Sequence, residues 1–399
     1  MANFPEKTFS PTVVDGMRGV GTDIVSTRIK PDVADKIFSY QPNGNSVALL
    51  LVKTKKKRKV GQYQFYFLQK DRMPVRDRIN LAAGYDANDV SIVVDNGERF
   101  YPRAVVLNTR TMERFIVKSV SSNTLTIESR GLGDTADDMQ DNDELEIIGT
   151  AYPEGAGKED AKSIKEEARY NYCQTIRTQM DFTGRDLNTD MFGGKDLSTE
   201  QKWQSSEHTQ KIERAILWGA RATWSDSVSG KTTTTMGGVH YFIQDENEWD
   251  LGGIAFNERN LTEYLEEGMR YGKGGRHGSK TKWVFAASRY ATEMNGWGLP
   301  QTRYQNTVKI LGIAATKYQT FHGTLYIVDH PLFEGDNADK AFMLDMNHLQ
   351  YVFHQGRDTS LRRNVQDPDI DGKSHEWLSD VSIEIVFPAA HGFWRNISL

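Results

Sequence analysis

Residues 42–74 read PNGNSVALLLVKTKKKRKVGQYQFYFLQKDRMP, and their succession of apolar, basic and aromatic side chains decides how the rest of the chain is interpreted. The apolar run Ser46–Val52 and the alternating run Gln62–Gln69 both have the character of β-strands. Between them lie five consecutive basic residues, Lys55–Lys59. The sequence therefore predicts a β-hairpin with a basic tip.

Composition restricts what this basic tip can bind. The chain has 399 residues and a net charge of −5, and its pI is near 6.0, whereas a dedicated nucleic-acid binder normally has a clear basic excess. A single cysteine, Cys173, excludes an internal disulfide framework and fits a reducing compartment. The start MANFPEKTFS lacks a signal-peptide pattern, and the run Val47–Val52 is far shorter than the roughly 20 residues that cross a bilayer. We therefore expect a soluble intracellular product with no membrane partner.

The order of predicted elements indicates a mixed fold. The first 43 residues are rich in proline and glycine and have the composition of an extended arm. Short strand-like runs separated by turns predict a small β-barrel or sandwich between Asp86 and Thr150. Lys158–Arg177 has helical character, and a longer helix begins at the capping sequence Ser198–Gln201. Helices and strands alternate in the remainder, so we predict the α+β class.

Several segments imitate a chemical site but lack an essential residue. Gly230–Lys231–Thr232 resembles the end of a phosphate-binding loop, but Ser225 stands where that loop needs a glycine. Asp367–Leu378 imitates a calcium loop, but its twelfth position is not the required glutamate. His375–Glu376 begins a zinc-protease motif in which Ser379 replaces the second histidine. We therefore expect no enzyme activity, no cofactor and no metal site.

The order of these elements resembles the major capsid proteins of tailed bacteriophages, which share the Hong Kong 97-like fold. The resemblance follows the chain in the same order but includes no matching stretch between residues 246 and 305. The stretches that carry it are Pro42–Pro74, Val106–Thr135, Glu144–Gly155, Lys211–Gly219, Thr234–Ile243 and Phe387–Leu399.

This resemblance implies a domain plan and a set of partners. The implied parts are an N-terminal arm at residues 1–43, an extended loop region at 44–157 with an inserted β-barrel-like subdomain at about 86–150, a peripheral domain at 158–240 with a spine helix at about 197–223, an axial domain at 241–375 and a C-terminal strand at 376–399. Copies would assemble into hexamers and pentamers of an icosahedral shell that encloses double-stranded DNA. Portal, scaffolding and decoration proteins are the implied partners, and the virion, assembled in the bacterial cytoplasm, is the implied location.

A shell protein needs surfaces that bind other copies, and two charged segments are the candidates. The basic residues are Lys53, Lys55, Lys56, Lys57, Arg58 and Lys59, and the acidic residues are Asp134, Asp137, Asp138, Asp141, Asp143 and Glu144. We expect the basic tip of one copy to contact the acidic surface of another. Each exposed pair contributes only ~0–1 kcal/mol, so the contact would act through orientation and number.

Other interpretations of the same residues stay open. The two charged loops can both be solvated and never meet, or the basic tip can touch packaged DNA. A nuclear import signal has the same composition but fits poorly with a folded hairpin. For the whole chain, the alternative is a β-rich binding or decoration module of a virion or cell surface, which would form a monomer or small oligomer rather than a shell.

Overall fold

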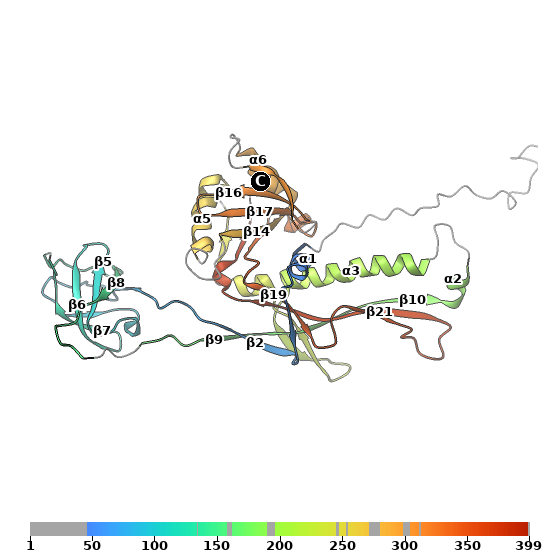
Figure 1. Ribbon diagram of the computed structural model, residues 1–399, viewed down its shortest axis with the longest axis horizontal. Helices are drawn as coiled ribbons and strands as arrows, with labels where there is room; N and C mark the ends of the chain where they lie inside the picture. The colour runs from blue at the N-terminus through green and yellow to red at the C-terminus, as the bar shows by residue number, and fades with distance from the viewer. Residues whose placement is uncertain are drawn as a thin grey trace, which may run out of the picture. The chain divides into compact units, whose positions relative to one another are not determined.

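The computed structural model of the chain describes residues 46–133, 135–157, 162–189, 196–244, 247–252, 254–270, 280–297, 304–310 and 313–397. It divides into two compact units (Figure 1). The body consists of Met1–Phe65 and Tyr170–Leu399, and the insertion consists of Tyr66–Arg169. The arm predicted at residues 1–43 and the predicted contact residue Asp134 lie outside the described residues.

The insertion is a six-stranded sheet with its own core. Its strands are β3 (Arg76–Arg78), β4 (Ser91–Val93), β5 (Ala104–Asn108), β6 (Arg114–Ser121), β7 (Thr124–Ser129) and β8 (Glu144–Thr150), paired in the order β3-β8-β5-β6-β7-β4. A bridge between Ile79 and Val94 joins the two ends of this order, which closes the sheet into a small barrel. Buried and half-buried positions alternate along β5, so one face of each strand fills the interior.

A long sheet forms the backbone of the body. Its strands are β1 (Lys57–Val60), β19 (Leu349–His354), β21 (Gly372–Ile385) and β10 (Gln174–Thr183) in that order, and β20 (Ser360–Arg363) also pairs with β21. Helix α3 (Asp196–Trp218) runs along β10 and β21 (Figure 1). His208 of α3 bonds to Thr178 at 3.0 Å and Ser379 at 2.7 Å, so α3 covers the face of the sheet that carries these two residues.

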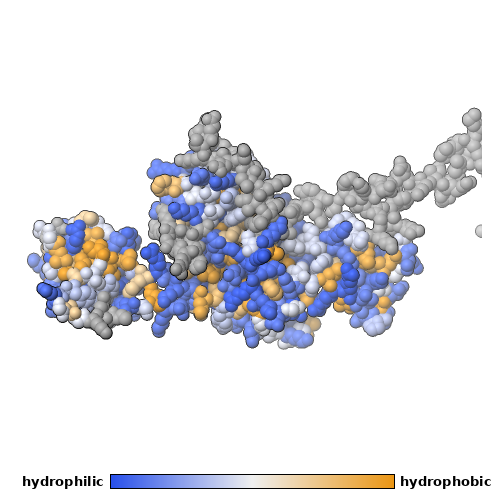
Figure 2. Space-filling model, viewed as in Figure 1, coloured by the Kyte–Doolittle hydropathy of each residue, from blue (hydrophilic) through white to orange (hydrophobic). Residues whose placement is uncertain are grey.

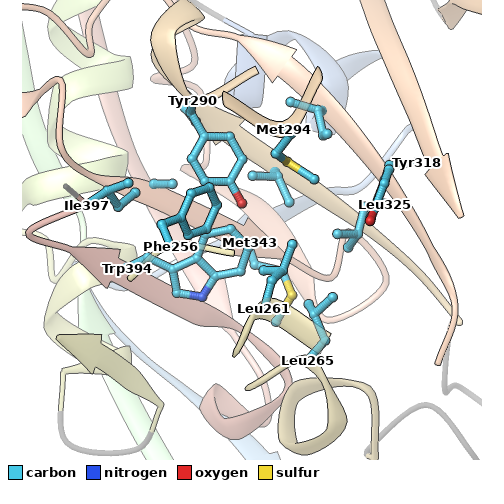
Figure 3. Packing of buried hydrophobic residues seen from close by; sticks show 14 of the residues in the cluster. Phe256, Leu261, Leu265, Tyr290, Met294, Tyr318, Leu325, Met343, Trp394 and Ile397 are labelled. Carbon is cyan, nitrogen blue, oxygen red and sulfur yellow. The ribbon is translucent and has the colours of Figure 1, made fainter. Parts of the chain in front are cut away.

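A second, seven-stranded sheet completes the body. Its order is β13 (Glu248–Asp250), β22 (Gly392–Arg395), β18 (Ala341–Leu344), β14 (Thr281–Ala286), β17 (Thr324–Asp329), β16 (Ile313–Gln319) and β15 (Tyr304–Ile310). Helices α5 (Glu258–Arg270) and α6 (Ser288–Gly296) supply apolar side chains to its core. Figure 3 shows Phe256, Tyr290 and Trp394 packed together there. The described chain is therefore a mixed fold in which strands dominate, and the predicted α+β class is confirmed.

The remaining elements are short. They are α1 (Ser46–Lys53), β2 (Gln64–Gln69) paired with β9 (Glu167–Tyr172), α2 (Gly184–Asn188), β11 (Ala222–Ser225) paired with β12 (Thr232–Thr235), α4 (Val239–Ile243), and the 3-10 helices η2 (Gly97–Arg99), η3 (Gly335–Asn337) and η4 (Pro388–Ala390). The sequence Gly230–Lys231–Thr232, which imitates a phosphate-binding loop, lies where the β11–β12 hairpin turns back into β12.

The predicted hairpin with a basic tip is wrong. Ser46–Lys53 forms α1, and the basic residues continue into β1, which pairs in parallel with β19 almost 300 residues later. A short apolar run fits a strand or a buried helix equally well, so its periodicity did not distinguish them. Val47 and Leu51, four positions apart, share a buried helical face. Tertiary contacts therefore determine that Ser46–Lys53 is the helix α1 and that the basic residues form the strand β1.

Two predicted helices also differ from the structure. The helix predicted at Lys158–Arg177 is wrong, because β9 and β10 occupy its second half from Glu167 onward. The spine helix predicted to end at about 223 ends at Trp218. A Cβ at Gly219 would lie 2.6 Å from the carbonyl oxygen of Met236, so only glycine lets the chain turn closely against that segment.

Candidate subunit-contact surfaces

The basic segment, Lys53–Lys59, joins the end of α1 to β1 at the edge of the long sheet. Lys55 has a positive φ of 58°, which makes the tight reversal between helix and strand. Lys53, Lys55 and Lys59 are exposed. The segment is thus part of a folded edge, and its side chains point in several directions.

Lys56 binds to the turn between β18 and β19. Its Nζ donates to Oδ1 of Asn347 at 2.9 Å and to the carbonyl oxygen of Met346. Burial lowers the pKa of Lys56, and the nearby Asp345 carboxylate partly opposes this shift. This lysine is therefore engaged within its own chain.

Lys57 stands at the rim of an apolar cavity. Its Nζ pairs with Oδ2 of Asp358 at 3.0 Å and lies 5.3 Å from the centre of the Tyr351 ring. The cavity has a volume of about 250 Å³, and Ala48 of α1 and Ile212 of α3 contribute to its wall. No local sequence pattern indicates this cavity, because its wall combines residues more than 300 positions apart.

Arg58 pairs with a carboxylate beneath it. Its Nη1 lies 2.5 Å from Oε2 of Glu384 on β21, whose side chain is only 9 % exposed. No ion pair of Lys55 or Lys59 is found among the residues that the structure describes. Of the six predicted basic contact residues, the central three thus have partners in their own chain, whereas Lys55 and Lys59 face outward.

The acidic loop, residues 135–146 of the insertion, is held by arginines of the same unit. Asp143 is buried and pairs with Nε of Arg110 at 2.6 Å, and Asn108 donates to it at 3.0 Å. Burial alone would raise the pKa of the Asp143 carboxyl, but the hydrogen bonds from Arg110 and Asn108 bring it below its usual value. Asp143 is therefore a structural residue rather than a surface contact.

The other described acidic residues remain accessible while they shape the loop. Oδ1 of Asp138 accepts the N–H of Ala87 at 2.9 Å, and Oδ1 of Asp141 accepts the N–H of Leu81 at 2.9 Å. Asp137, Asp138 and Asp141 are exposed. Glu144 is half-buried and lies 3.3 Å from Nη1 of Arg76. The loop thus presents three carboxylates on a braced backbone.

A buried ion pair that the sequence did not indicate holds the start of this loop. Arg130 and Glu113 pair at 2.8 Å with side chains 5 % and 0 % exposed. The Glu113 carboxylate also accepts the N–H groups of Gly131 and Asp137, both at 3.2 Å. No local pattern reveals such a pair, since its members are 17 residues apart.

Charge is distributed unequally between the two units. Tyr66–Arg169 contains 20 acidic and 14 basic residues. The net charge of the insertion is therefore more negative than the −5 of the whole chain. Figure 2 also shows hydrophobic residues gathered on the visible face of the insertion. Its exposed large apolar side chains include Val90, Met112 and Ile148. A partner of this unit would meet acidic and apolar surface together.

Two other kinds of feature are absent from the part of the chain that the structure describes. Within the described ranges, no three His, Cys, Asp or Glu side chains gather as they would around a metal ion. No helix in the described part of the chain is long and apolar enough to cross a membrane. The exposed charges of the basic segment and of the acidic loop mark these two segments as candidate subunit-contact surfaces.

Comparisons with known proteins agree with this direction. A family model described as SU10 major capsid protein matches residues 15–398. The chain is 20% identical over 286 residues to the major capsid protein of Pseudomonas phage PaMx41. The aligned region covers 70% of this chain and 68% of that protein.

Two solved structures support the fold. One from Gordonia phage Cozz is similar with a TM-score of 0.52 at 10% identity, covering 97% of this chain and 99% of that one. The capsid of an empty GTA particle is similar with a TM-score of 0.50 at 8% identity, covering 96% of this chain and all of the other, 100%.

Proposed function

Because the chain belongs to the SU10 major capsid protein family, we propose that its copies assemble as hexamers and pentamers of an icosahedral shell around double-stranded DNA. The chain is a phage major capsid protein with the Hong Kong 97-like fold. The observation that carries the proposal is the family match over residues 15–398, which is almost the whole chain. The alternative of a β-rich binding or decoration module does not describe a chain matched over this length.

The proposed assembly uses many weak contacts between identical copies. Lys55 and Lys59 would face the exposed carboxylates of Asp137, Asp138 and Asp141 on another copy. Lys56, Lys57 and Arg58 would hold the basic segment in place, because they are already bound within their own chain. Each exposed pair contributes at most about 1 kcal/mol, and repetition over a closed shell multiplies this small contribution.

The further partners belong to the same proposal. A portal, scaffolding proteins and decoration proteins would meet the shell, and residues 1–43 would form an arm that straps a neighbouring copy. The family is a class of structural proteins rather than enzymes. The protein acts in the virion, and assembly would take place in the cytoplasm of the host bacterium.

The test is the mass and shape of the expressed full-length chain across a salt series, measured by light scattering and negative-stain microscopy. The proposal predicts capsomer rings or closed shells for the wild type. Replacing Lys55 and Lys59 with glutamine should lower the salt concentration at which particles dissociate. Lys231→Gln, which changes a charge in the turn of the β11–β12 hairpin, is the matched control. If the Lys55/Lys59 double variant and the Lys231→Gln control dissociate at the same salt concentration, the proposed contact is contradicted.

A further inference from the structure

Three carboxylates at every fourth position of β21 lie on one face of the long sheet. They belong to Glu376, Asp380 and Glu384. Ser379 points toward α3, as its bond to His208 shows. Because neighbouring side chains on a strand point to opposite faces, these three residues point away from α3. All three side chains are largely or fully buried, with exposures of 2 %, 14 % and 9 %.

An arginine lies over each of these buried carboxylates. Arg177 of β10 lies 2.5 Å from Glu376, and Arg362 of β20 lies 3.5 Å from the same carboxylate. Arg357 lies 2.6 Å from Asp380, and Arg58 of β1 lies 2.5 Å from Glu384. The guanidinium-bearing side chains are 60 %, 49 %, 38 % and 39 % exposed in that order. Four partly exposed arginines therefore form the solvent-facing layer, and the buried carboxylates of β21 lie beneath them. We call these four residues the arginine row: Arg58, Arg357, Arg362 and Arg177.

This arrangement prepares the arginines for an outer partner. A guanidinium has five N–H donors in a planar fork, and the pairs with β21 use one or two of them. The buried carboxylates fix the position of each fork, so less side-chain entropy is lost when a second acceptor binds. The row is thus a receiving surface for carboxylates rather than a set of isolated surface ion pairs.

We infer that the arginine row of one copy receives the acidic loop of the insertion of a second copy. This inference rests on the proposed function and extends the contact proposed for the basic segment, since Arg58 belongs to both surfaces. Charge complementarity selects this occupant. The acidic loop has six acidic residues and no basic one between residues 135 and 146, and three of its carboxylates are exposed on a braced backbone.

The local charge does not suit packaged DNA. Four arginines lie over three carboxylates, so the row has an excess of one positive charge, and Asp181 follows Arg177 along the same face of β10. Binding to a phosphate backbone depends on neutralising many phosphates with surplus cations. Carboxylates on a rigid loop match a few oriented guanidinium forks, which bind them in a bidentate geometry.

The first experiment compares two single substitutions in the full-length chain. Arg177→Gln removes one member of the row, while Arg362 continues to pair with Glu376, so the buried carboxylate is not left alone. Arg259→Gln removes an exposed arginine of α5 that is paired with Glu263. Arg177→Gln should lower the salt concentration at which half of the shells dissociate, whereas Arg259→Gln should leave it at the wild-type value. Equal values for the two variants would overturn the inference.

The second experiment identifies the partner directly. Shells are assembled from an equal mixture of ¹⁴N- and ¹⁵N-labelled chains that carry Arg177→Lys, with Arg357→Lys as a second attachment point, and are treated with a zero-length carbodiimide. Peptides should join position 177 or 357 to residues 135–146 of a chain with the other label. Links within one chain to the underlying Glu376 or Asp380 are expected in any case. Mixed-label links that join only other segments, or no mixed-label link to residues 135–146, would overturn the inference.

The two experiments separate this inference from the proposed function. If wild-type chains form no particle under any condition, both the inference and the proposed function are disproved. Closed shells without the mixed-label cross-link would retain the capsid function and remove only the arginine row as the receiving surface.

Discussion

The carboxylate of Glu213 accepts a hydrogen bond from Nε2 of His330 at 2.9 Å, and neither side chain is exposed. The same carboxylate accepts the N–H groups of Val47 and Ala48 at 2.8 and 2.9 Å. Glu213 lies in α3, Val47 lies in the first turn of α1, and His330 follows β17. One buried group therefore fixes the N-terminus of α1, the long helix and the seven-stranded sheet together.

Removing this carboxylate should destabilise the body. Glu213→Ala leaves two backbone donors and His330 without their acceptor in a site closed to water, so we expect a loss of about 3 kcal/mol. The measurement is denaturant unfolding followed by circular dichroism. Glu263→Ala, which removes a carboxylate from an exposed pair on α5, should cost less than about 0.5 kcal/mol. Similar losses for the two variants would contradict the structural role of Glu213.

The insertion should fold when it is expressed alone as residues 66–169. It has a closed sheet and a separate core that includes Phe100, Phe115 and Leu145, all fully buried. We expect a single cooperative thermal transition. Phe115→Ala should destabilise this fragment by about 3–5 kcal/mol because it opens a cavity in the core. The exposed Val90→Ala is the control, and a fragment without cooperative unfolding would disprove an independent insertion.

Stability should decrease as the pH falls from 6.5 toward 4. Burial, and secondarily Lys211, lowers the pKa of His208 to about 4. Burial, and secondarily Lys282, lowers the pKa of His391 to about 3. In the unfolded chain a histidine has a pKa of about 6.5, so below that pH the unfolded state binds protons that the folded state does not. The stabilisation is thus fully present above pH 6.5 and is lost as the pH falls.

The pH prediction is checked by thermal unfolding between pH 7.5 and 5, where most carboxyl groups remain ionised. The midpoint should fall over this range, and His208→Gln should make the fall shallower. A midpoint that rises on acidification, or an unchanged slope in the variant, would refute the assignment to buried neutral histidines.

The single cysteine should be inert in the folded chain. Burial, with Asp380 as a second cause, raises the pKa of the Cys173 thiol to about 12, and the side chain is only 3 % exposed. The thiolate is the reactive form, and almost none is present at pH 8. A chromogenic disulfide reagent should react with one thiol per chain in guanidinium and with far less than one in buffer. Rapid complete reaction of the native chain would contradict this burial.

The sequence predicted best where the pattern is local. The strands from Ser91 to Thr150 were recognisable because alternating side chains and turn sequences repeat over short distances. By contrast, β1 consists mainly of basic residues and forms a strand because it pairs in parallel with β19. No local sequence pattern predicts this pairing.

The candidate contact residues show the same division. The charge of the basic segment and of the acidic loop was visible in the sequence, but the partners that bind Lys57, Arg58 and Asp143 within the chain were not. Nor was the arginine row visible, because its members come from β1, β10 and β20 and from the loop before β20. Its alignment depends on the register of β21 with two neighbouring strands.

The most direct test of the account is a cryo-electron microscopy reconstruction of particles formed by the full-length chain. We expect a closed icosahedral shell in which the body forms five-fold and six-fold rings and the acidic loop of one copy lies on the arginine row of another. A chain that remains a 45.3 kDa monomer at every concentration, salt and co-expressed scaffold, or that forms only a small closed oligomer, would contradict it.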